Sequence, residues 1–356
     1  MRALRECKVD LKFTGRGGRQ MRAIAGEKFT DWLNDAAVLG LWEVLKNYGY
    51  FRQQFGQVLA EIGKAKPNAV VLIDYPGFNL RLARALRKQS AERKIIYYIS
   101  PQVWAWNRGR IKKMARFLNL MLCIFPFEAD LYNKSGLRTL FVGHPMVERL
   151  RARKIDIERD PNLIGLFPGS RPREVRKIFP ILVETARELC KQRPRLHFEI
   201  AAASEPLAAE ISRTLMDAPM RQELFQVVTG ETAATMQRAS FGIIASGSAT
   251  LEAAYFRLPF VLVYKVAWPT YLAARLVVNV KYLGMPNVLA DKEVAPEFIQ
   301  HRARPDAIAK TVLQLIDNPT ARDRMISEFD RIVAKLGEGG ASEKAARAIV
   351  EELSAT

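Results

Sequence analysis

The sequence predicts an α/β protein built from two doubly wound domains. Apolar runs rich in β-branched residues alternate with stretches of helical periodicity, and these runs are residues 69–73, 94–99, 120–125, 163–167, 197–201, 241–244 and 260–264. Continuous apolar strands separated by helices indicate parallel sheets that are covered on both faces. At 356 residues the chain is too long for one ordinary core and suits two.

A charged stretch at residues 149–161 separates the strand that ends at Phe141 from the strand that begins at Leu163. We place the domain boundary within this stretch, so the first domain covers residues 1–155 and the second covers residues 156–356. The sequence does not decide which of the two domains the helix at about residues 338–354 packs on. Ligands of such domains bind beyond the carboxyl ends of the strands, so functional residues are expected in the loops that follow the strands.

The chain is strongly basic, with 55 Lys and Arg against 37 Asp and Glu and a formal net charge of +18. This balance favours an anionic partner, which can be nucleic acid, acidic lipid or a phosphorylated substrate. The basic residues are spread along helices such as residues 81–88 and 108–116. Neither helix-turn-helix nor zinc-finger spacing occurs, and basic residues do not alternate with aromatic ones on short strands, so we expect no nucleic-acid partner.

The three cysteines lie far apart and the three histidines share no ligand spacing. We therefore expect neither a disulfide framework nor a protein-bound metal. No signal peptide opens the chain, and no apolar run approaches the roughly 18 residues that cross a bilayer. A cytoplasmic protein is expected, with attachment to a membrane surface left open.

The clearest local signal is the turn after residues 163–167, which reads Pro168, Gly169, Ser170, Arg171 and leads into a helix. Gly169 lets the backbone approach a ligand, the helix start offers free N–H groups, and the guanidinium of Arg171 matches phosphate oxygens. These features predict a diphosphate site. The alternative is an ordinary strand-to-helix turn with Arg171 in solvent.

A second strand ends in another run of small residues before a helix. Hydroxyl groups and a glycine at this helix start offer further phosphate donors, and they belong to Ser246, Gly247, Ser248 and Thr250. One turn later, the carboxylate of Glu252 is suited to accept hydrogen bonds from ribose hydroxyls. Together the two turns predict a nucleoside diphosphate site, whereas simple N-capping is the alternative for the second turn.

Two candidates for acceptor chemistry follow strands of the first half. Asp74 comes directly after residues 69–73, where a carboxylate faces the ligand crevice and can take a proton from an attacking hydroxyl. Capping of the next turn is the equally weighted alternative. Trp104 and Trp106 precede Arg108 and Arg110, a pattern that suits an amphipathic phosphorylated ligand, although partly buried packing is the more common role of such tryptophans.

Residues 29–62 carry bulky apolar side chains at helical density with cations nearby. Such a face can lie at a lipid headgroup boundary, while core packing is the commoner explanation. The apolar members are Phe29, Trp32, Leu33, Val38, Leu39, Leu41, Trp42, Val44 and Leu45.

With these segments in order, the chain resembles the lipid A disaccharide synthases over nearly its whole length. The matching motifs are IDYPGFN at 73–79, SPQVWAWNRGRIKK at 100–113, FPFE at 125–128, FVGHP at 141–145, PGSR at 168–171, ASGSATLE at 245–252 and MPNVLA at 285–290. This ordered set is far more specific than a single glycine-rich loop.

The resemblance implies two facing Rossmann-like domains of the GT-B glycosyltransferase type. The first would bind the acceptor and face the membrane, and the second would bind a UDP-sugar. The implied reaction moves 2,3-diacylglucosamine from UDP-2,3-diacylglucosamine to the 6-hydroxyl of 2,3-diacylglucosamine 1-phosphate with inversion, without a cofactor. The implied partners are these two substrates, an anionic membrane surface at the inner face of the cytoplasmic membrane and, as one option, a second copy of the chain in a homodimer.

The resemblance also implies roles for particular residues. Asp74 would be the general base, with Arg171 and Asn287 completing the catalytic set. Weaker acceptor-side candidates are Trp104, Trp106, Arg108, Arg110, His144, Glu297 and Gln300. Some family members carry a second Asp where this chain has Gly77, which leaves the identity of the base open.

The chain departs from the family pattern at its start. Family members begin with a short strand and a GExSGD loop, whereas Met1 aligns inside the first helix. We expect the first strand of the sheet to be missing, with a misassigned start as the explanation. The alternatives are a truncated, inactive remnant that acts as a basic membrane-surface binder, and a related UDP-sugar transferase or epimerase.

Overall fold

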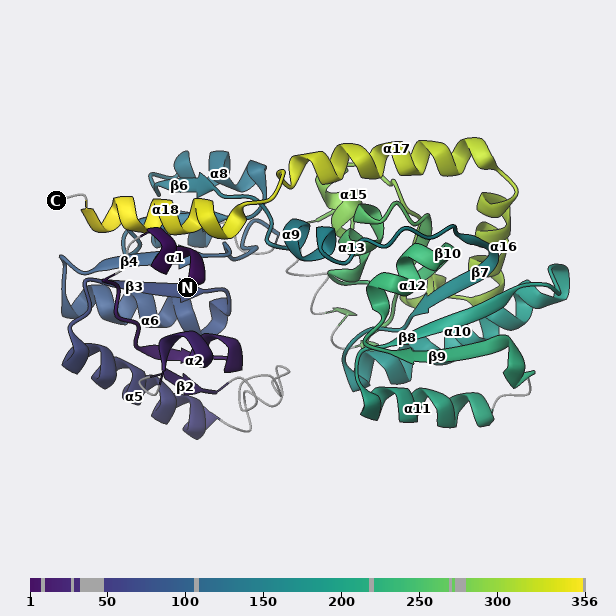
Figure 1. Ribbon diagram of the computed structural model, residues 1–356, viewed down its shortest axis with the longest axis horizontal. Coiled ribbons are helices and arrows are strands. Elements are labelled where there is room, and N and C mark those ends of the chain that lie inside the picture. The colour runs from purple at the N-terminus through teal and green to yellow at the C-terminus, as the bar shows by residue number, and fades with distance from the viewer. Residues whose placement is uncertain are drawn as a thin grey trace. The chain divides into compact units, whose positions relative to one another are not determined.

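The computed structural model describes residues 1–7, 10–26, 29–32, 48–105, 109–217, 221–268, 271–272 and 280–354. The chain forms two compact units, Met1–Pro145 with Gly339–Thr356 and Met146–Glu338. The division falls earlier than the expected boundary after residue 155, because helix α9 (Met146–Arg151) packs on helix α13 (Ala249–Tyr255) of the second unit. Both units combine helices with parallel sheets, which confirms the α/β class (Figure 1).

The larger sheet of the first unit is parallel and runs in the order β3-β4-β5-β6. Its strands are β3 (Ala69–Ile73), β4 (Lys94–Tyr98), β5 (Leu120–Cys123) and β6 (Thr139–Phe141). The helices that accompany it are α5 (Tyr48–Ala65), α6 (Pro76–Gln89), α7 (Gly109–Met114) and α8 (Pro126–Asn133). Because all four strands are parallel, their carboxyl ends share one edge, and the loops after β3, β4 and β5 meet there.

A second, two-stranded sheet pairs β1 (Gly15–Gly17) with β2 (Phe29–Asp31). Helix α1 (Arg2–Cys7) precedes β1 in the sequence, and helix α2 (Arg19–Ala25) lies between β1 and β2. Among the described residues, this pair is not hydrogen-bonded to the larger sheet, so β3 is an edge strand there. Leu11 and Phe13 pack against the same apolar cluster as Ala69 and Val71 of β3.

Helix α18 (Ala341–Ser354) packs on the first unit, a point that the sequence left open. Figure 1 shows it beside α1, and its small residues allow close contact with the strands. Ala345, Ala346 and Ile349 share a buried cluster with Ile96 of β4 and Leu122 of β5. Two polar contacts add to this packing, since Glu352 receives Lys94 Nζ on its carbonyl and Arg138 on its carboxylate, each at 2.6 Å.

The second unit contains one parallel sheet in the order β12-β11-β10-β7-β8-β9. Its strands are β7 (Asp160–Phe167), β8 (His197–Ala202), β9 (Phe225–Thr229), β10 (Ala239–Ala245), β11 (Phe260–Tyr264) and β12 (Glu297–Ile299). The helices, in addition to α9 and α13, are α10 (Pro172–Gln192), α11 (Glu205–Met216), α12 (Thr232–Arg238), α15 (Met285–Ala290), α16 (Pro305–Ile316) and α17 (Pro319–Lys335). The strand order reverses between β7 and β10, which makes this pair the topological switch point.

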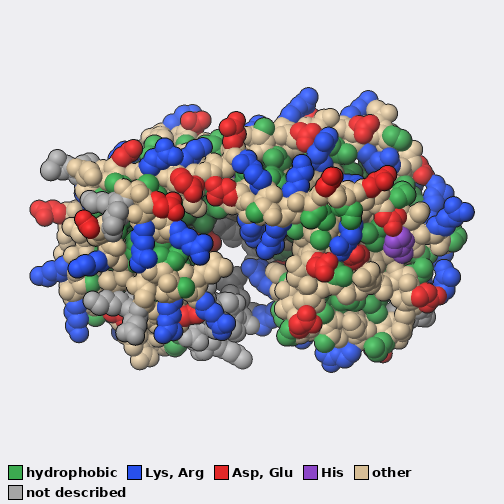
Figure 2. Space-filling model, in the orientation of Figure 1, with side chains coloured by type: hydrophobic (Ala, Val, Ile, Leu, Met, Phe, Trp, Pro, Cys, Tyr) green, Lys and Arg blue, Asp and Glu red, His purple; other side chains and the backbone are tan. Residues whose placement is uncertain are grey.

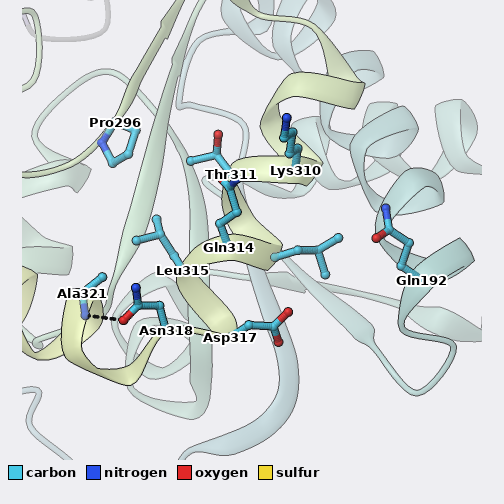
Figure 3. A pocket seen from close by; sticks show the side chains of 10 residues that line it. Gln192, Pro296, Lys310, Thr311, Gln314, Leu315, Asp317, Asn318 and Ala321 are labelled. Carbon is cyan, nitrogen blue, oxygen red and sulfur yellow. Dashed lines mark hydrogen bonds between the residues drawn. The ribbon is translucent and has the colours of Figure 1, made fainter.

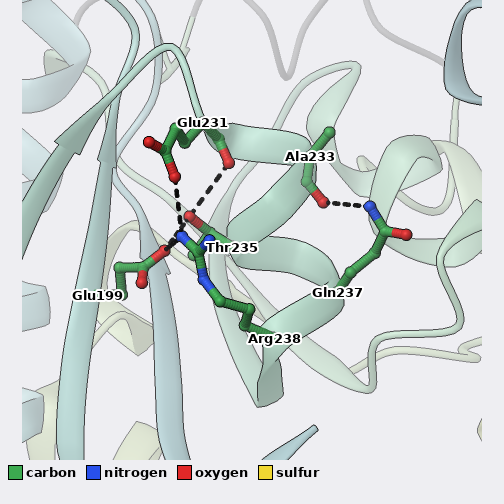
Figure 4. A network of polar contacts seen from close by, with 6 residues as sticks. All are labelled: Glu199, Glu231, Ala233, Thr235, Gln237 and Arg238. Atoms are coloured by element: carbon green, nitrogen blue, oxygen red, sulfur yellow. Dashed lines mark hydrogen bonds and ion pairs between the residues drawn. The ribbon is translucent and has the colours of Figure 1, made fainter. Parts of the chain in front are cut away.

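The core of this second sheet is apolar, and one polar network fastens a helix to it. Arg238 on α12 lies 2.6 Å from Glu199 on β8 and 3.0 Å from Glu231, and the hydroxyl of Thr235 also donates to Glu199 (Figure 4). Glu199 is buried, so its carboxylate needs these partners to offset the loss of water. Both donors bond to the same oxygen, Oε1 of Glu199, and the network ties α12 to β8.

The surface of the protein carries mixed charge. Figure 2 shows Lys and Arg side chains distributed over the visible face with Asp and Glu among them. Within the described ranges, no helix combines the length and apolar character that spanning a bilayer requires. The same part of the chain contains no group of three or more His, Cys, Asp or Glu side chains arranged to hold a metal ion.

Candidate functional site

The two small-residue turns of the second unit lie side by side. They follow β7 and β10, which are neighbouring parallel strands with Phe167 paired to Ile244. A Cβ placed on Gly169 would lie 3.7 Å from the Cβ of Ala245, so the turns are in near contact. The carboxyl ends of strands at a switch point are where doubly wound sheets bind ligands. The structure therefore brings together the two motifs that the sequence connected with a nucleoside diphosphate.

The first turn combines a glycine of positive φ with an exposed cation. Gly169 has φ +109°, and a Cβ there would lie 3.0 Å from Glu174 Oε2. Arg171 caps the N-terminus of α10 with extended backbone, and its side chain is 80% exposed with Nη1 3.0 Å from Glu174 Oε1. Ser170 is also exposed. The turn thus presents a guanidinium, a hydroxyl and the unpaired N–H groups of a long helix at the sheet edge.

The second turn divides its hydroxyl groups between the surface and the interior. Gly247 and Ser248 are exposed, Ser246 is half-buried, and Ser248 forms no side-chain cap bond with α13. The N-capping alternative therefore does not account for the hydroxyl of Ser248. Thr250 differs from expectation, because it is fully buried and its hydroxyl donates to the carbonyl of Gly247 at 2.8 Å. Thr250 shapes the turn and does not present its hydroxyl outward.

Glu252 has a protein partner that the sequence did not reveal. Its Oε1 lies 2.7 Å from Nη2 of Arg149 on α9. Arg149 belongs to the charged stretch at residues 149–161, where the sequence predicted the domain boundary. Only one carboxylate oxygen of Glu252 is engaged in this ion pair, so the other remains able to accept a hydrogen bond.

Tyr264 is a second residue at this edge that sequence reasoning missed. It ends β11 and is half-buried. Burial raises the pKa of its hydroxyl above the ordinary value, the charge of Glu174 raises it further, and Arg171 acts in the opposite direction. The phenol is therefore a neutral donor near the first turn. Its position as the final residue of an apolar strand was the available signal.

Asn287 does not reach outward as expected. It is 1% exposed, and its Nδ2 donates to the carbonyl of Ala295 at 2.8 Å and to Glu297 Oε1 at 2.9 Å. Its Oδ1 accepts from the N–H groups of Val294 at 2.8 Å and Ala295 at 2.9 Å. Since an amide side chain offers two donors and one acceptor oxygen with two lone pairs, all its bonding positions are used within the protein. Asn287 supports the loop between α15 and β12.

Glu297 and Gln300 are buried supports of the same kind, contrary to their expected place beside a ligand. Glu297 accepts the N–H of Leu283 at 3.0 Å and that of Gly284 at 2.8 Å. Gln300 bonds to both the N–H and the carbonyl of Val266, at 2.8 and 3.2 Å. The two side chains hold segments that follow β11 and precede α15. No local pattern of residues distinguishes a polar group that faces protein from one that faces a ligand.

Asp74 lies at the carboxyl end of β3 and is exposed. The N-cap of α6 is Tyr75, which forms no side-chain cap bond, and within the described residues the hydrogen bonds of Asp74 are made by its main chain. The capping alternative for Asp74 is therefore not observed. An exposed carboxylate at this edge has the placement that a general base requires.

The loop after β4 is anchored by a buried carboxylate. Glu128 on α8 accepts the hydroxyl of Ser100 at 2.5 Å, the indole N–H of Trp104 at 2.9 Å and the N–H of Phe125 at 3.3 Å. Burial raises the pKa of Glu128 to about 7, although the bonds from Ser100 and Trp104 lower it. Trp104 is buried, which agrees with a packing role for this side chain and not with contact to an acceptor at the surface.

The remaining acceptor-side candidates lie in different environments. Arg110 is exposed on α7, and His144 is half-buried with its ring tilted against Phe125 at 5.4 Å between centroids. Trp106 and Arg108 lie outside the described residues. The structure therefore places Arg110 on the surface and His144 in a packed position.

The proposed membrane-facing segment is described only at its two ends. Phe29 is buried beneath Gly17, and Trp32 packs edge-on against Phe78 with centroids 5.3 Å apart. Phe55 and Ile62 also pack against the core of the first unit. These residues follow the core-packing alternative. The other apolar members, from Leu33 to Leu45, lie outside the described residues.

Comparison with known proteins identifies the family. The sequence profile described as lipid-A-disaccharide synthetase matches residues 1–350.

The chain belongs to the lipid-A-disaccharide synthetase family.

Sequence relatives in this family cover nearly the whole chain. The lipid-A-disaccharide synthase of Geobacter sulfurreducens is 35% identical over 355 residues, which are 96% of this chain and 90% of the relative. The enzyme of the same name from Persephonella marina is 34% identical over 361 residues, 97% of this chain and 93% of the relative. The resemblance recognised in the motifs is thereby confirmed.

Solved structures show the fold of this family member at low sequence identity. The S. aureus MnaA-UDP co-structure has a TM-score of 0.63 and 12% identity, and the match covers 99% of this chain and 91% of that one. UDP-GlcNAc 2-epimerase from Neisseria meningitidis, bound to UDP-GlcNAc, has a TM-score of 0.58 and 12% identity, covering 95% and 99%. Both support the two-domain α/β architecture expected from the sequence.

One large hollow of this family member lies away from the two turns. It has a volume of about 770 Å³ and is bordered by segments that precede β8 and β12 and by the junction of α16 and α17 (Figure 3). Its lining residues include Gln192, Pro296, Lys310, Gln314 and Asn318. Since it adjoins the amino ends of these strands, it is at the opposite edge of the sheet from Gly169 and Gly247.

Proposed function

We propose that the chain transfers 2,3-diacylglucosamine from its UDP carrier to the 6-hydroxyl of 2,3-diacylglucosamine 1-phosphate. The reaction inverts the anomeric centre, forms a β-1,6 disaccharide 1-phosphate and releases UDP. The observation that carries this proposal is the adjacency of the turns after β7 and β10 at the switch point, in a member of this family.

The donor would bind at those turns. Arg171 and the N-terminus of α10 provide positive charge for the diphosphate, and Ser170, Ser246 and Ser248 provide hydroxyl donors close to it. The free lone pairs of Glu252 are suited to the ribose hydroxyls. Charge builds on the diphosphate as the sugar leaves, so a guanidinium fixed near that position stabilises the transition state more than the bound substrate.

The acceptor would bind to the first unit. The exposed carboxylate of Asp74 is the proposed general base, which takes the proton of the 6-hydroxyl as that oxygen attacks the anomeric carbon. Arg110 is a surface cation suited to the 1-phosphate of the acceptor, because a guanidinium binds phosphate with two parallel bonds. Both substrates carry acyl chains, and the net charge of +18 favours work at an anionic membrane surface, which we place at the inner face of the cytoplasmic membrane.

The test offers the purified protein UDP-2,3-diacylglucosamine and 2,3-diacylglucosamine 1-phosphate, and product is followed by mass spectrometry. We expect disaccharide 1-phosphate and UDP in equal amounts. Arg171→Ala is expected to lose at least about 100-fold in kcat/KM. Arg213→Ala, which removes an exposed arginine of α11, is the matched control and should retain activity. Turnover of UDP-N-acetylglucosamine without any disaccharide would instead favour an epimerase or another UDP-sugar transferase.

A further inference from the structure

The turn between β3 and α6 holds two consecutive residues in a backbone region that side chains disfavour. Asp74 has φ +49° and Tyr75 has φ +47°. Residues other than glycine adopt this left-handed region infrequently, and two in succession persist only when the surrounding structure holds them. The conformation of Asp74 must therefore be fixed by specific contacts.

The backbone of Asp74 is held from both sides. Its N–H donates to the carbonyl of Tyr98 at 2.9 Å, which continues the ladder between β3 and β4. Its carbonyl accepts two bonds, from the hydroxyl of Tyr97 at 2.6 Å and from Nδ2 of Asn79 at 2.7 Å. Every one of these contacts is to the main chain, so the carboxylate is left free to project from the turn.

The two donors to this carbonyl differ in origin. Asn79 lies on α6, a few residues along the same turn, and it also bonds to the carbonyl of Ile73 at 3.1 Å. Tyr97 comes from the neighbouring strand β4, so its bond ties the turn to the sheet. Loss of the Tyr97 bond would leave the turn secured only by groups that move with it or by the ladder bond to Tyr98.

The side chain of Tyr97 lies among apolar residues, and its hydroxyl is its only polar group. The ring is completely buried in the cluster that contains Leu72, Phe78 and Val103. Phenylalanine would fill the same space without a hydroxyl that needs a partner. This hydroxyl donates to the carbonyl of Asp74. Burial raises the pKa of Tyr97, and the charge of Asp74 raises it further, so the hydroxyl stays protonated and remains a donor.

We propose that Tyr97 is a positioning residue for Asp74: its hydroxyl holds the Asp74 carbonyl and thereby fixes the direction in which the carboxylate leaves the end of β3. This inference rests on the proposed function of Asp74 as the base. A base must lie within hydrogen-bond reach of the hydroxyl that it deprotonates, and a small rotation of the turn would break that alignment.

The test compares Tyr97→Phe with a matched control, Tyr132→Phe. Tyr132 is equally buried, and its hydroxyl also donates 2.6 Å to a backbone carbonyl, that of Pro101, without contact to Asp74. For Tyr97→Phe we expect kcat to fall by about tenfold, because a misaligned Asp74 carboxylate takes the proton less effectively in the transition state, with both KM values within about twofold. The control should lose similar thermal stability with a smaller change in kcat.

A second arm asks whether Tyr97 acts through Asp74. In an Asp74→Asn background, Tyr97→Phe should cause no further loss of kcat, because the residue that it positions has already lost its function. A further tenfold loss in that background, or equal kcat values for Tyr97→Phe and Tyr132→Phe, would overturn the inference. Full activity of Asp74→Asn would instead remove the basis of the proposed function.

Hydrogen exchange gives a readout that needs no activity. The amides of Phe78 and Asn79 donate to the carbonyl of Tyr75 and report on the turn. Their exchange should be about tenfold faster in Tyr97→Phe than in Tyr132→Phe. Equal exchange in the two variants would contradict the proposed positioning even if neither sugar substrate reacts.

Discussion

The guanidinium of Arg149 lies 2.7 Å from the carboxylate of Glu252, and this ion pair joins α9 to the helix that follows the second donor turn. The side chain of Glu252 is 13% exposed, so its partner sets the orientation of the carboxylate that we assign to the ribose. Arg149 itself is half exposed, so water screens part of the attraction.

Arg149→Gln should raise the KM for the UDP-sugar by about three- to tenfold and leave the KM for the acceptor unchanged. The unpaired carboxylate of Glu252 would then repel the diphosphate and lose its fixed orientation. Arg149→Lys keeps the charge and should recover part of the loss. Steady-state kinetics with each substrate varied in turn provides the measurement, and an effect on the acceptor alone would contradict this reading.

Gly169→Ala should destabilise the second unit by about 1–3 kcal/mol and weaken UDP binding. The residue has φ +109°, and the added Cβ would lie 3.0 Å from Glu174 Oε2. Gly247→Ala is the control for folding, because no atom lies within 4 Å of a Cβ placed there. Denaturant unfolding and UDP titration measure the two effects. Equal unfolding free energies for Gly169→Ala and Gly247→Ala would show that the turn tolerates a side chain.

Glu128→Gln should change how stability depends on pH. The pKa of Glu128 is raised from its ordinary value of 4.5 to about 7, so the folded protein holds this proton more tightly than the unfolded chain. Its contribution to stability is complete below pH 4.5 and is lost as pH rises through 7, by on the order of 3 kcal/mol. The difference in unfolding free energy between wild type and Glu128→Gln should therefore shift across this range, and a constant difference would argue against the assignment.

Asn287→Ala should lower the unfolding free energy by about 2–4 kcal/mol, since it removes four hydrogen bonds and leaves buried groups without partners. Asn318→Ala removes the exposed cap of α17 and should cost only about 1 kcal/mol. Chemical denaturation compares the two. If Asn287→Ala keeps full stability but loses donor affinity, Asn287 contacts the substrate after all.

Much of the fold follows from local sequence patterns. Long apolar runs such as residues 163–167 and 241–244 became central strands, because burial on both faces leaves an unbroken apolar signal. Strand β9 was not predicted, since Gln226 interrupts its apolar run at the edge of the sheet. The three-residue strand β12 was missed for a related reason, because Glu297 and Gln300 read as polar loop residues.

The sequence predicted the part of the candidate site that lies at the carboxyl ends of strands. It did not predict which polar side chains are bonded to other parts of the protein. The adjacency of Gly169 and Ala245 follows from the parallel pairing of two strands whose turns were read separately. The burial of Asn287, Thr250 and Glu297 does not follow from any local pattern, because a polar side chain has the same letters whether its partner is a ligand or a backbone carbonyl. The ion pair of Arg149 with Glu252 joins residues distant in sequence, which only the folded chain brings together.

Helix α18 belongs to the first unit but is synthesised after the second unit. Residues 146–338 form one uninterrupted unit, whereas the first unit needs α18 to cover Ile96 and Leu122. A ribosome makes α18 only after the whole second unit has emerged, so the sheet with Asp74 has an exposed apolar face for most of translation. The second unit can fold as it is made, whereas the first cannot complete its core until α18 has been made, and its exposed apolar face favours aggregation during that delay.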